Sequence, residues 1–161
     1  MIIDKKAVLE GAKEVFFKAH LAGYAGDGKD SVKTKSADGK VTIEFIEGDY
    51  RVLDEYYTTP HSDHSFGTTI IFYKGAPVWM MHYRGYYRKK VIPFLKEALG
   101  KAYAANAFFG GRGIRTYVVE RLHYQNFPMG SWSDFKGMEE IRIYETREQL
   151  GYHDYGGMSL I

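Results

Sequence analysis

Apolar and polar positions along the chain predict two helices. From Asp4 to about Leu21, apolar residues recur at steps of three and four, which is the spacing of one buried helix face. Asp4 is suited to cap the first turn of this helix. A second stripe from Val91 to about Ala102 predicts another helix, and Pro93 fits its first turn.

The stretch from Phe66 to Gly85 has the pattern of a β-hairpin, with β-branched and aromatic residues on either side of a short Gly/Pro turn. Strand alternation places Trp79, Met81 and Tyr83 on one face of its second strand. The other face is also largely apolar, so we expect the hairpin in the middle of a sheet that is covered on both sides. The aromatic face is either ordinary core or the floor of a pocket that stacks a flat ligand.

Further alternating runs predict the remaining strands, and one long polar segment predicts a loop. The strands are expected at Val41–Ile46, Tyr50–Thr58 and near Arg115–Tyr124, Glu139–Tyr144 and Gln149–Tyr155. Tyr24–Lys40 is rich in Gly, Lys, Asp and Ser and lacks periodicity, which predicts a mobile loop. Such a loop is either a solvated connection or a lid over a site, because it is longer than most connections.

The order of these elements predicts an α+β fold, with a mostly antiparallel sheet and two packed helices, in one domain over residues 1–161. Each half reads as a helix followed by three or four strands. The echo of Phe66-Gly67 in Phe135-x-Gly137 leaves open whether the halves are α-β-β-β(-β) pseudo-repeats with a cleft between them.

Composition and charge exclude several classes of function. The formal net charge of +2 argues against nucleic acid as a partner of this domain alone. The chain has no cysteine, which excludes disulfides, thiolate catalysis and zinc-thiolate sites. No apolar run approaches the roughly 18 residues that cross a membrane, and the first residues lack the pattern of a signal peptide. We therefore expect a cytoplasmic protein with no membrane partner.

One histidine-rich segment is a candidate for a metal. His61-x-Asp63-His64 offers two imidazoles and a carboxylate, which His123 or His153-Asp154 could complete. The spacing matches no strong metal signature and the segment follows Pro60, so a solvated turn is favoured. The sequence therefore predicts no metal and no cofactor.

Two basic segments are candidates for binding an anion. Tyr83–Lys90 interleaves three tyrosines with four cations just before the second helix, where the helix dipole favours anions. Arg112 lies among Gly110, Gly111 and Gly113, on a bend where a guanidinium could fork onto an oxyanion. The alternatives are a solvated charged patch for the first segment and a helix cap with a tight turn for the second.

Carboxylates within predicted strands are the only candidates for catalysis. Asp54 with Glu139 or Glu140 could act as acid and base if their surroundings separated their pKa values. The alternative is that they are surface carboxylates at alternate strand positions.

Taken together, several spaced motifs resemble DUF5680, a domain family of unknown function from bacteria and phages. The motifs are Tyr24-Ala25-Gly26, Tyr50 with Asp54 and Tyr57, Phe66-Gly67, Pro77-Val78-Trp79-x-Met81-x-Tyr83-x-Gly85, Phe94-Leu95-x-x-Ala98-Leu99, Arg112-Gly113, Phe135-x-Gly137-x-Glu139-x-Ile141 and Tyr155-Gly156-Gly157. The chain departs from the family pattern at Phe66-Gly67-Thr68-Thr69, which lacks a glutamate, and at Ile114, which replaces a proline.

The resemblance implies no known reaction. The family's domains stand alone or follow the helix-turn-helix of XRE-type regulators, which implies ligand sensing. A free-standing copy could instead sequester a signalling molecule.

Our first hypothesis is therefore non-catalytic binding of a small, flat, anionic, nucleotide-like ligand. Trp79, Met81 and Tyr83 would form a stacking wall, and this hypothesis fails if Trp79 and Arg112 lie far apart or if Trp79 is wholly enclosed by the core. The candidate ligand-binding residues are Tyr24, Asp54, Trp79, Met81, Tyr83, Arg88, Arg112, Glu139 and Tyr155.

Two alternatives belong to other classes. A small hydrolase or lyase would need Asp54 and Glu139 in one cleft, about 5–9 Å apart. A protein-interaction module or homodimer would expose the aromatic face and Tyr83–Lys90 as a patch for a partner.

Overall fold

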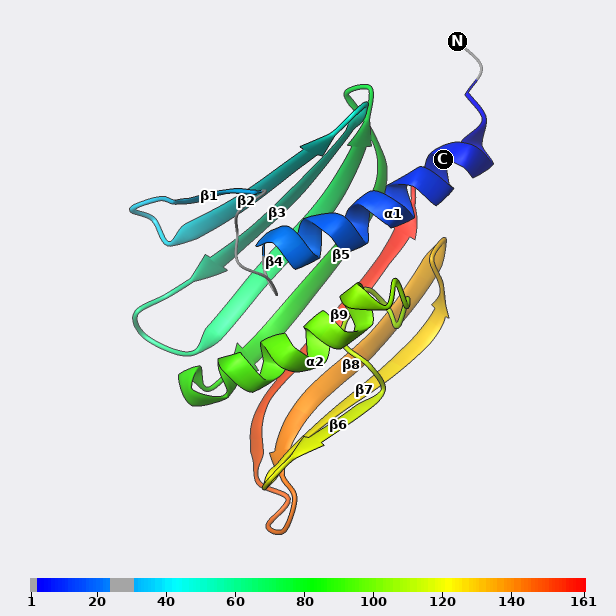
Figure 1. The fold of residues 1–161 in the computed structure, drawn as a ribbon. Coiled ribbons are helices and arrows are strands. Elements are labelled where there is room, and N and C mark those ends of the chain that lie inside the picture. The colour runs from blue at the N-terminus through cyan, green and yellow to red at the C-terminus, as the bar shows by residue number, and fades with distance from the viewer. Residues whose placement is uncertain (1–2, 24–30) are drawn as a thin grey trace.

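The computed structural model describes residues 3–23 and 31–161, in which a nine-stranded antiparallel sheet carries two α-helices (Figure 1). The strand order is β1-β2-β3-β4-β5-β9-β8-β7-β6. The elements are α1 Lys5–Gly23, β1 Val32–Lys35, β2 Lys40–Glu47, β3 Tyr50–Thr58, β4 His64–Tyr73, β5 Ala76–Tyr87, a 3₁₀ turn Lys89–Val91, α2 Ile92–Ala104, β6 Thr116–Val119, β7 Leu122–Ser131, β8 Asp134–Ile143 and β9 Gln149–Ser159. The predicted α+β class is confirmed.

The two helices begin as the sequence predicts. The Ala7 N–H donates to Asp4 Oδ1 at 3.1 Å, which caps α1, and a proline lies in the first turn of α2. The apolar stripe of α1 packs on β2 to β5 and against α2. None of the helices in the described part of the chain is long and apolar enough to cross a membrane.

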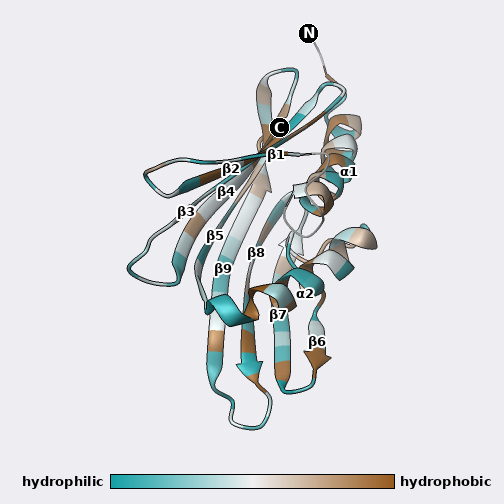
Figure 2. Cartoon of the chain, turned by 60° about the vertical axis from the view of Figure 1, so that its left-hand side comes forward, coloured by the Kyte–Doolittle hydropathy of each residue, from teal (hydrophilic) through white to brown (hydrophobic). Residues whose placement is uncertain are grey.

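Both helices lie on the same face of the sheet, so the opposite face is open (Figures 1 and 2). The predicted hairpin is confirmed as β4 and β5, with β5 at the centre of the sheet. The expectation that the hairpin is covered on both sides is wrong. His82 and Arg84, on the outer face of β5, are exposed because no helix of the described residues packs there.

The inner face of β5 belongs to the core. The Trp79 ring stacks on Trp132 with 4.2 Å between the ring centroids and on Phe135 with 5.5 Å. The Trp79 indole N–H donates to the Trp132 carbonyl at 2.8 Å. Trp79 is 0% exposed and Met81 is 1% exposed, so both side chains are enclosed.

Two segments differ from the sequence prediction. Val32–Lys35 lies in the predicted loop but forms β1, the edge strand beside β2, while residues 24–30 are outside the described residues. The strand expected near Arg115–Tyr124 is a hairpin of β6 and β7, and β7 continues through Pro128 to Ser131. Proline is tolerated there because β6 pairs with β7 only as far as Gln125, which leaves the rest of β7 at the sheet edge.

The two halves of the sheet share a local arrangement. In each half, a tyrosine on the central strand covers a glycine on the next strand and donates its hydroxyl to a side chain one strand further on. The three residues are Tyr83, Gly67 and Asp54 in one half, and Tyr155, Gly137 and Asn126 in the other. Tyr83 and Tyr155 are direct partners across β5 and β9. Whether the halves are true pseudo-repeats stays a prediction.

Trp79→Ala tests the placement of this side chain in the core. We expect the free energy of unfolding to fall by about 3–5 kcal/mol, because the substitution leaves a cavity among stacked rings. Urea denaturation measures the loss. Val118→Ala is the control, because Val118 on β6 is 49% exposed and its truncation should change stability by about 0.5 kcal/mol or less. A similar small loss for Trp79→Ala would contradict the assignment.

Candidate functional site

A pocket of about 800 Å³ opens on the helix-covered side of the first half of the sheet. Its buried residues come from α1, from the inner face of β3, β5 and β9 and from the turn after α2, and they are His20, Asp54, Tyr83, Tyr87, Arg112 and His153. The β1–β2 turn and residues 58–65, between β3 and β4, form further walls. The fold thus brings segments that are far apart in the sequence around one space.

The rim of this pocket is basic. Lys33 and Lys35 reach it from β1, Lys89 from the 3₁₀ turn and Lys96 from α2. With Arg112, five cationic side chains line the pocket, against three carboxylates, which are Asp38, Asp54 and Asp63. Lysines gathered at the mouth of a pocket raise the local concentration of anions.

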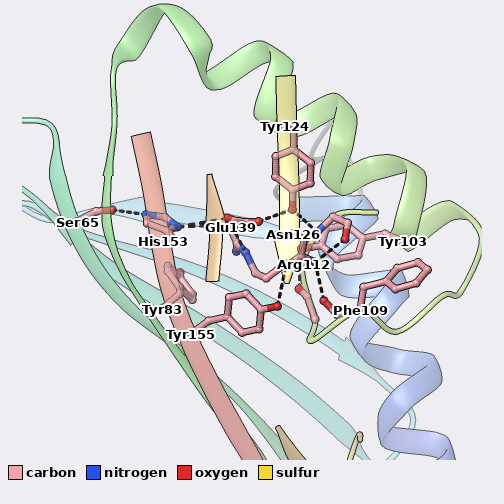
Figure 3. A network of polar contacts seen from close by, with 12 residues as sticks. Ser65, Tyr83, Tyr103, Phe109, Arg112, Tyr124, Asn126, Glu139, His153 and Tyr155 are labelled. Carbon is pink, nitrogen blue, oxygen red and sulfur yellow. Dashed lines mark hydrogen bonds and ion pairs between the residues drawn. The ribbon is translucent and has the colours of Figure 1, made fainter. Parts of the chain in front are cut away.

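Arg112 is held in place by a buried ion pair. Its Nε and Nη2 donate to Glu139 Oε1 at 3.0 and 2.6 Å, and the Tyr124 hydroxyl donates to Glu139 Oε2 (Figure 3). Glu139 is 0% exposed. Burial raises the pKa of Glu139, but the charge and hydrogen bonds of Arg112 outweigh it, so the pKa lies below its ordinary value. Glu139 is therefore an ionised support for Arg112.

The turn that carries Arg112 depends on glycine. Gly110 and Gly111 have φ of +69° and +71°, a conformation that side chains other than glycine rarely adopt. A Cβ on Gly110 would lie 2.4 Å from the Tyr155 ring. Ile114 donates its N–H to the Ala98 carbonyl at 3.4 Å, a hydrogen bond that proline could not make at this position.

His153 links the ion pair to the pocket. Its Nδ1 lies 3.4 Å from Arg112 Nη2, and its Nε2 lies 3.3 Å from Ser65 Oγ (Figure 3). A guanidinium can only donate, so Nδ1 accepts and the ring proton sits on Nε2, which donates to Ser65. Burial, together with the Arg112 charge, lowers the pKa of His153 to about 3. The imidazole is therefore neutral at physiological pH.

Ser65, His153 and Glu139 follow one another in the order of a catalytic triad, but the ring proton of His153 is on Nε2, which faces Ser65, and not on Nδ1. Glu139 Oε1 is 3.7 Å from His153 Nδ1, beyond hydrogen-bond distance, while Arg112 occupies that nitrogen. Because Nε2 carries the proton, His153 cannot take the Ser65 hydroxyl proton. The arrangement therefore supplies no general base to Ser65.

Asp54 is the buried carboxylate of the pocket. Its Oδ1 accepts from Thr69 Oγ1 and from the Tyr83 hydroxyl, both at 2.8 Å. His20 of α1 lines the pocket beside it and contacts the Phe16 carbonyl through Nδ1 at 2.9 Å. Burial is the main cause that lowers the pKa of His20.

The structure gathers only part of the predicted site at this pocket. Asp54, Tyr83 and Arg112 line it, and Glu139 lies directly behind them. Tyr155 also lies behind the pocket, and its hydroxyl donates to Asn126 Oδ1 at 2.7 Å.

Three predicted contacts need correction. Trp79 and Met81 do not line the pocket because they are enclosed in the core, so the ligand-binding hypothesis fails in the form that relied on Trp79. Of the three residues of the expected stacking wall, only Tyr83 lines the pocket. Arg88 is exposed and pairs with Glu148 at 2.8 Å, and its neighbour Lys89 lines the pocket instead. Tyr24 lies outside the described residues.

The carboxylate pair and the histidine segment also have clear positions. Asp54 lines the pocket, whereas both oxygens of Glu139 are bonded within the core, so the two carboxylates do not face a common cleft. His61, Asp63 and His64 lie on the pocket wall. Across residues 3–23 and 31–161, no group of three or more His, Asp or Glu side chains is placed to hold a metal ion.

Sequence reasoning missed several residues of the pocket. His20 left a readable signal, because it follows Phe16 by one helical turn on the buried stripe of α1. Lys33, Lys35 and Lys96 left none, because only the tertiary structure brings β1 and α2 to one place. Lys89 lies in the predicted anion-binding segment, and the sequence named His153 only as a candidate metal ligand.

Comparison with known proteins identifies a family. A family model described as "Domain of unknown function (DUF5680)" matches residues 54–158. Neither the curated proteins nor the solved structures contain a match to the chain. The matched region includes Asp54, Tyr83, Arg112 and His153, and it leaves out His20 and the lysines of β1.

Glu139→Gln tests the ion pair under the pocket. We expect the free energy of unfolding to fall by about 3–5 kcal/mol, because the Arg112 charge would stay buried without an opposite charge. Glu148→Gln is the matched control, since its ion pair with Arg88 is exposed and should contribute little. Chemical denaturation compares the two variants, and equal losses would contradict a structural role for Glu139.

The pH dependence of stability tests the state of His153. Its pKa is about 3 in the folded protein against an ordinary value of 6.5, so the unfolded chain gains a proton first as the pH falls. The contribution of His153 to the free energy of unfolding is complete above about pH 6.5 and declines towards pH 3, by at most about 1.4 kcal/mol per pH unit. His20, whose pKa is also lowered, adds to the same trend.

Urea denaturation between pH 7.5 and 5 measures this slope in wild type and in His153→Gln. The slope should be smaller in the variant, whereas His82→Gln, on the exposed outer face, serves as control. Nitrogen NMR shifts should show His153 neutral at pH 5 with its proton on Nε2. A His153 ring that titrates near its ordinary pKa would overturn the assignment.

Proposed function

We propose that this chain, which belongs to the DUF5680 family, binds a small, flat, anionic, nucleotide-like ligand in the pocket without transforming it. The observation that carries the proposal is a buried polar floor under a rim of lysines. Binding of this kind would serve either sensing or sequestration of a signalling molecule.

Size and charge both support a small anionic ligand. The volume of about 800 Å³ falls within the range of small-molecule sites, which is roughly 300–1,000 Å³. The lysines lie at the mouth, where phosphate or carboxylate groups can stay partly hydrated, while the floor is buried. A ligand with a compact head and an anionic tail fits this division.

The aromatic residues of the pocket support a flat head. Tyr56, Tyr83 and Tyr87 line it, and Tyr83 and Tyr87 are almost fully buried. Tyrosine rings offer flat apolar faces to a planar group while their hydroxyls remain available for hydrogen bonds. These rings take the role that the sequence had suggested for Trp79 and Met81.

Two observations support binding rather than catalysis. His153 carries its proton on the nitrogen that faces Ser65, so the serine has no base. Glu139 is engaged with Arg112 and Tyr124, so the pair of Asp54 and Glu139 that the sequence suggested is not available for an acid-base cycle.

The double substitution Lys33→Ala, Lys35→Ala tests the anion rim. Titration calorimetry with GMP and AMP should show at least one of them binding to wild type. The same nucleotide should bind the variant about tenfold more weakly, because charge attraction at the mouth is lost. Lys136→Ala is the control, since Lys136 is exposed on the outer face of β8.

Native mass spectrometry of gently purified protein, beside a denatured sample, checks the same proposal without a chosen probe. Extra mass that is lost on denaturation would support it and give the size of the ligand. A bare protein mass together with no heat from any nucleotide would contradict it.

Self-association is a second candidate function, favoured by the outer face of the sheet. Large apolar side chains stand exposed there, namely Phe66, Phe127, Met129 and Met158, at 48–61% exposure. Light scattering over a range of concentrations tests for a dimer, and a constant monomer mass would remove this candidate.

A further inference from the structure

The floor of the pocket offers an oxygen acceptor that no described residue uses. Both hydrogen bonds of Asp54 go to Oδ1, and Oδ2 accepts none from the described residues. Oδ2 is not among the atoms sealed from solvent without a partner, so it is reached from the pocket that Asp54 lines. The Asp54 residue as a whole is only 7% exposed.

His20 provides a second acceptor beside it. Its Nδ1 lies 2.9 Å from the Phe16 carbonyl, which can only accept, so Nδ1 carries the proton of the neutral ring. Nε2 is then a bare acceptor, and no hydrogen bond to it comes from the described residues. His20 and Asp54 together line both the large pocket and a small cavity. Burial lowers the pKa of His20 and the Asp54 charge opposes that effect, so the two side chains are neighbours.

Two neighbouring acceptors set the chemistry of the group that they receive. A buried acceptor without a donor is costly, so the head of the ligand must bring N–H or O–H groups. The Asp54 carboxylate also repels anions, which directs the anionic part of the ligand towards the lysines at the mouth. A bound ligand is therefore oriented with its N–H or O–H donors at the floor of the pocket and its negative charge at the mouth.

The protein contains a related contact between paired N–H donors and a carboxylate. In the wall of the pocket, the Arg112 guanidinium donates two N–H groups to Glu139 Oε1, at 3.0 and 2.6 Å. The Tyr83 ring lies 5.3 Å from that guanidinium, and the same tyrosine donates to Asp54. A planar pair of N–H donors is the natural partner of a carboxylate.

We propose that Asp54 and His20 select a ligand head with two adjacent N–H donors in one plane, as on the N1–H and N2–H₂ edge of guanine. The inference rests on the proposed function and specifies its ligand as a guanine nucleotide. A small molecule that carries both a guanidinium and a carboxylate offers the same pair of N–H donors. Adenine offers one donor beside an acceptor at this edge, so Asp54 would oppose it.

Calorimetric titrations with GMP, IMP and AMP test the inference. IMP is the matched comparison because it keeps N1–H and the phosphate but lacks the N2 amino group. GMP should bind at least about tenfold more tightly than IMP or AMP, since one donor of the pair is lost or replaced in each. 4-Guanidinobutyrate, which carries a guanidinium and a carboxylate, tests the other source of the same chemistry.

Asp54→Asn should reduce the affinity for GMP about tenfold and make the difference in affinity between GMP and IMP smaller. The amide oxygen can still accept from Thr69 and Tyr83, while an N–H₂ group replaces the carboxylate oxygen that faces the ligand. Asp134→Asn is the control, because Asp134 is an exposed carboxylate outside the pocket. His20→Phe keeps an aromatic ring against Phe16 and removes the Nε2 acceptor together with the Nδ1 donor to the Phe16 carbonyl, so it provides a second variant if Asp54→Asn fails to fold.

The outcomes separate this inference from the proposed function. Equal affinities for the three nucleotides, or a preference for AMP, would overturn the head-group inference and leave the proposed function standing. Binding of 4-guanidinobutyrate that depends on Asp54, without nucleotide binding, would support the donor pair and overturn the nucleotide. No binding of any of these probes would overturn both.

Discussion

The buried pair of Arg112 and Glu139 is the interaction on which the site depends. It ties the glycine turn after α2 to the middle of β8, and Tyr124 on β7 completes the hydrogen bonds of Glu139. The Arg112 charge also sets the proton position of His153 and, through it, the orientation of the Ser65 hydroxyl. A buried ion pair contributes little net stability, but removing one partner is costly, so this geometry is strongly constrained.

The inner face of the sheet has two regions, a hydrophobic core and a polar pocket, and both lie on the side that the helices cover. The inner face holds the stacked rings of Trp79, Trp132 and Phe135 in one part and the polar pocket in another. Because α1 and α2 cover the same face, polar residues on that face are buried and must be paired. In one half, the hydroxyl of Tyr83 on β5 is paired with Asp54. In the other half, the hydroxyl of Tyr155, its partner on β9, is paired with Asn126.

Local patterns gave reliable predictions where the residues themselves define the geometry. The cap at Asp4, the proline in the first turn of α2 and the β4–β5 hairpin all follow from short-range rules. The predictions of a loop at Val32–Lys35 and of one strand near Arg115–Tyr124 were wrong because sheet pairing outweighs local preference there.

The sequence by itself determined the α+β class, the main elements and the family, and it predicted Asp54, Tyr83 and Arg112 as site residues. It did so because periodicity, turn chemistry and motif spacing are properties of neighbouring residues. Only the tertiary structure decided that Trp79 belongs to the core, that Glu139 supports Arg112, and that the lysines of β1 and α2 meet at one pocket. Those outcomes depend on strand order and on which face the helices cover, and long-range packing sets both.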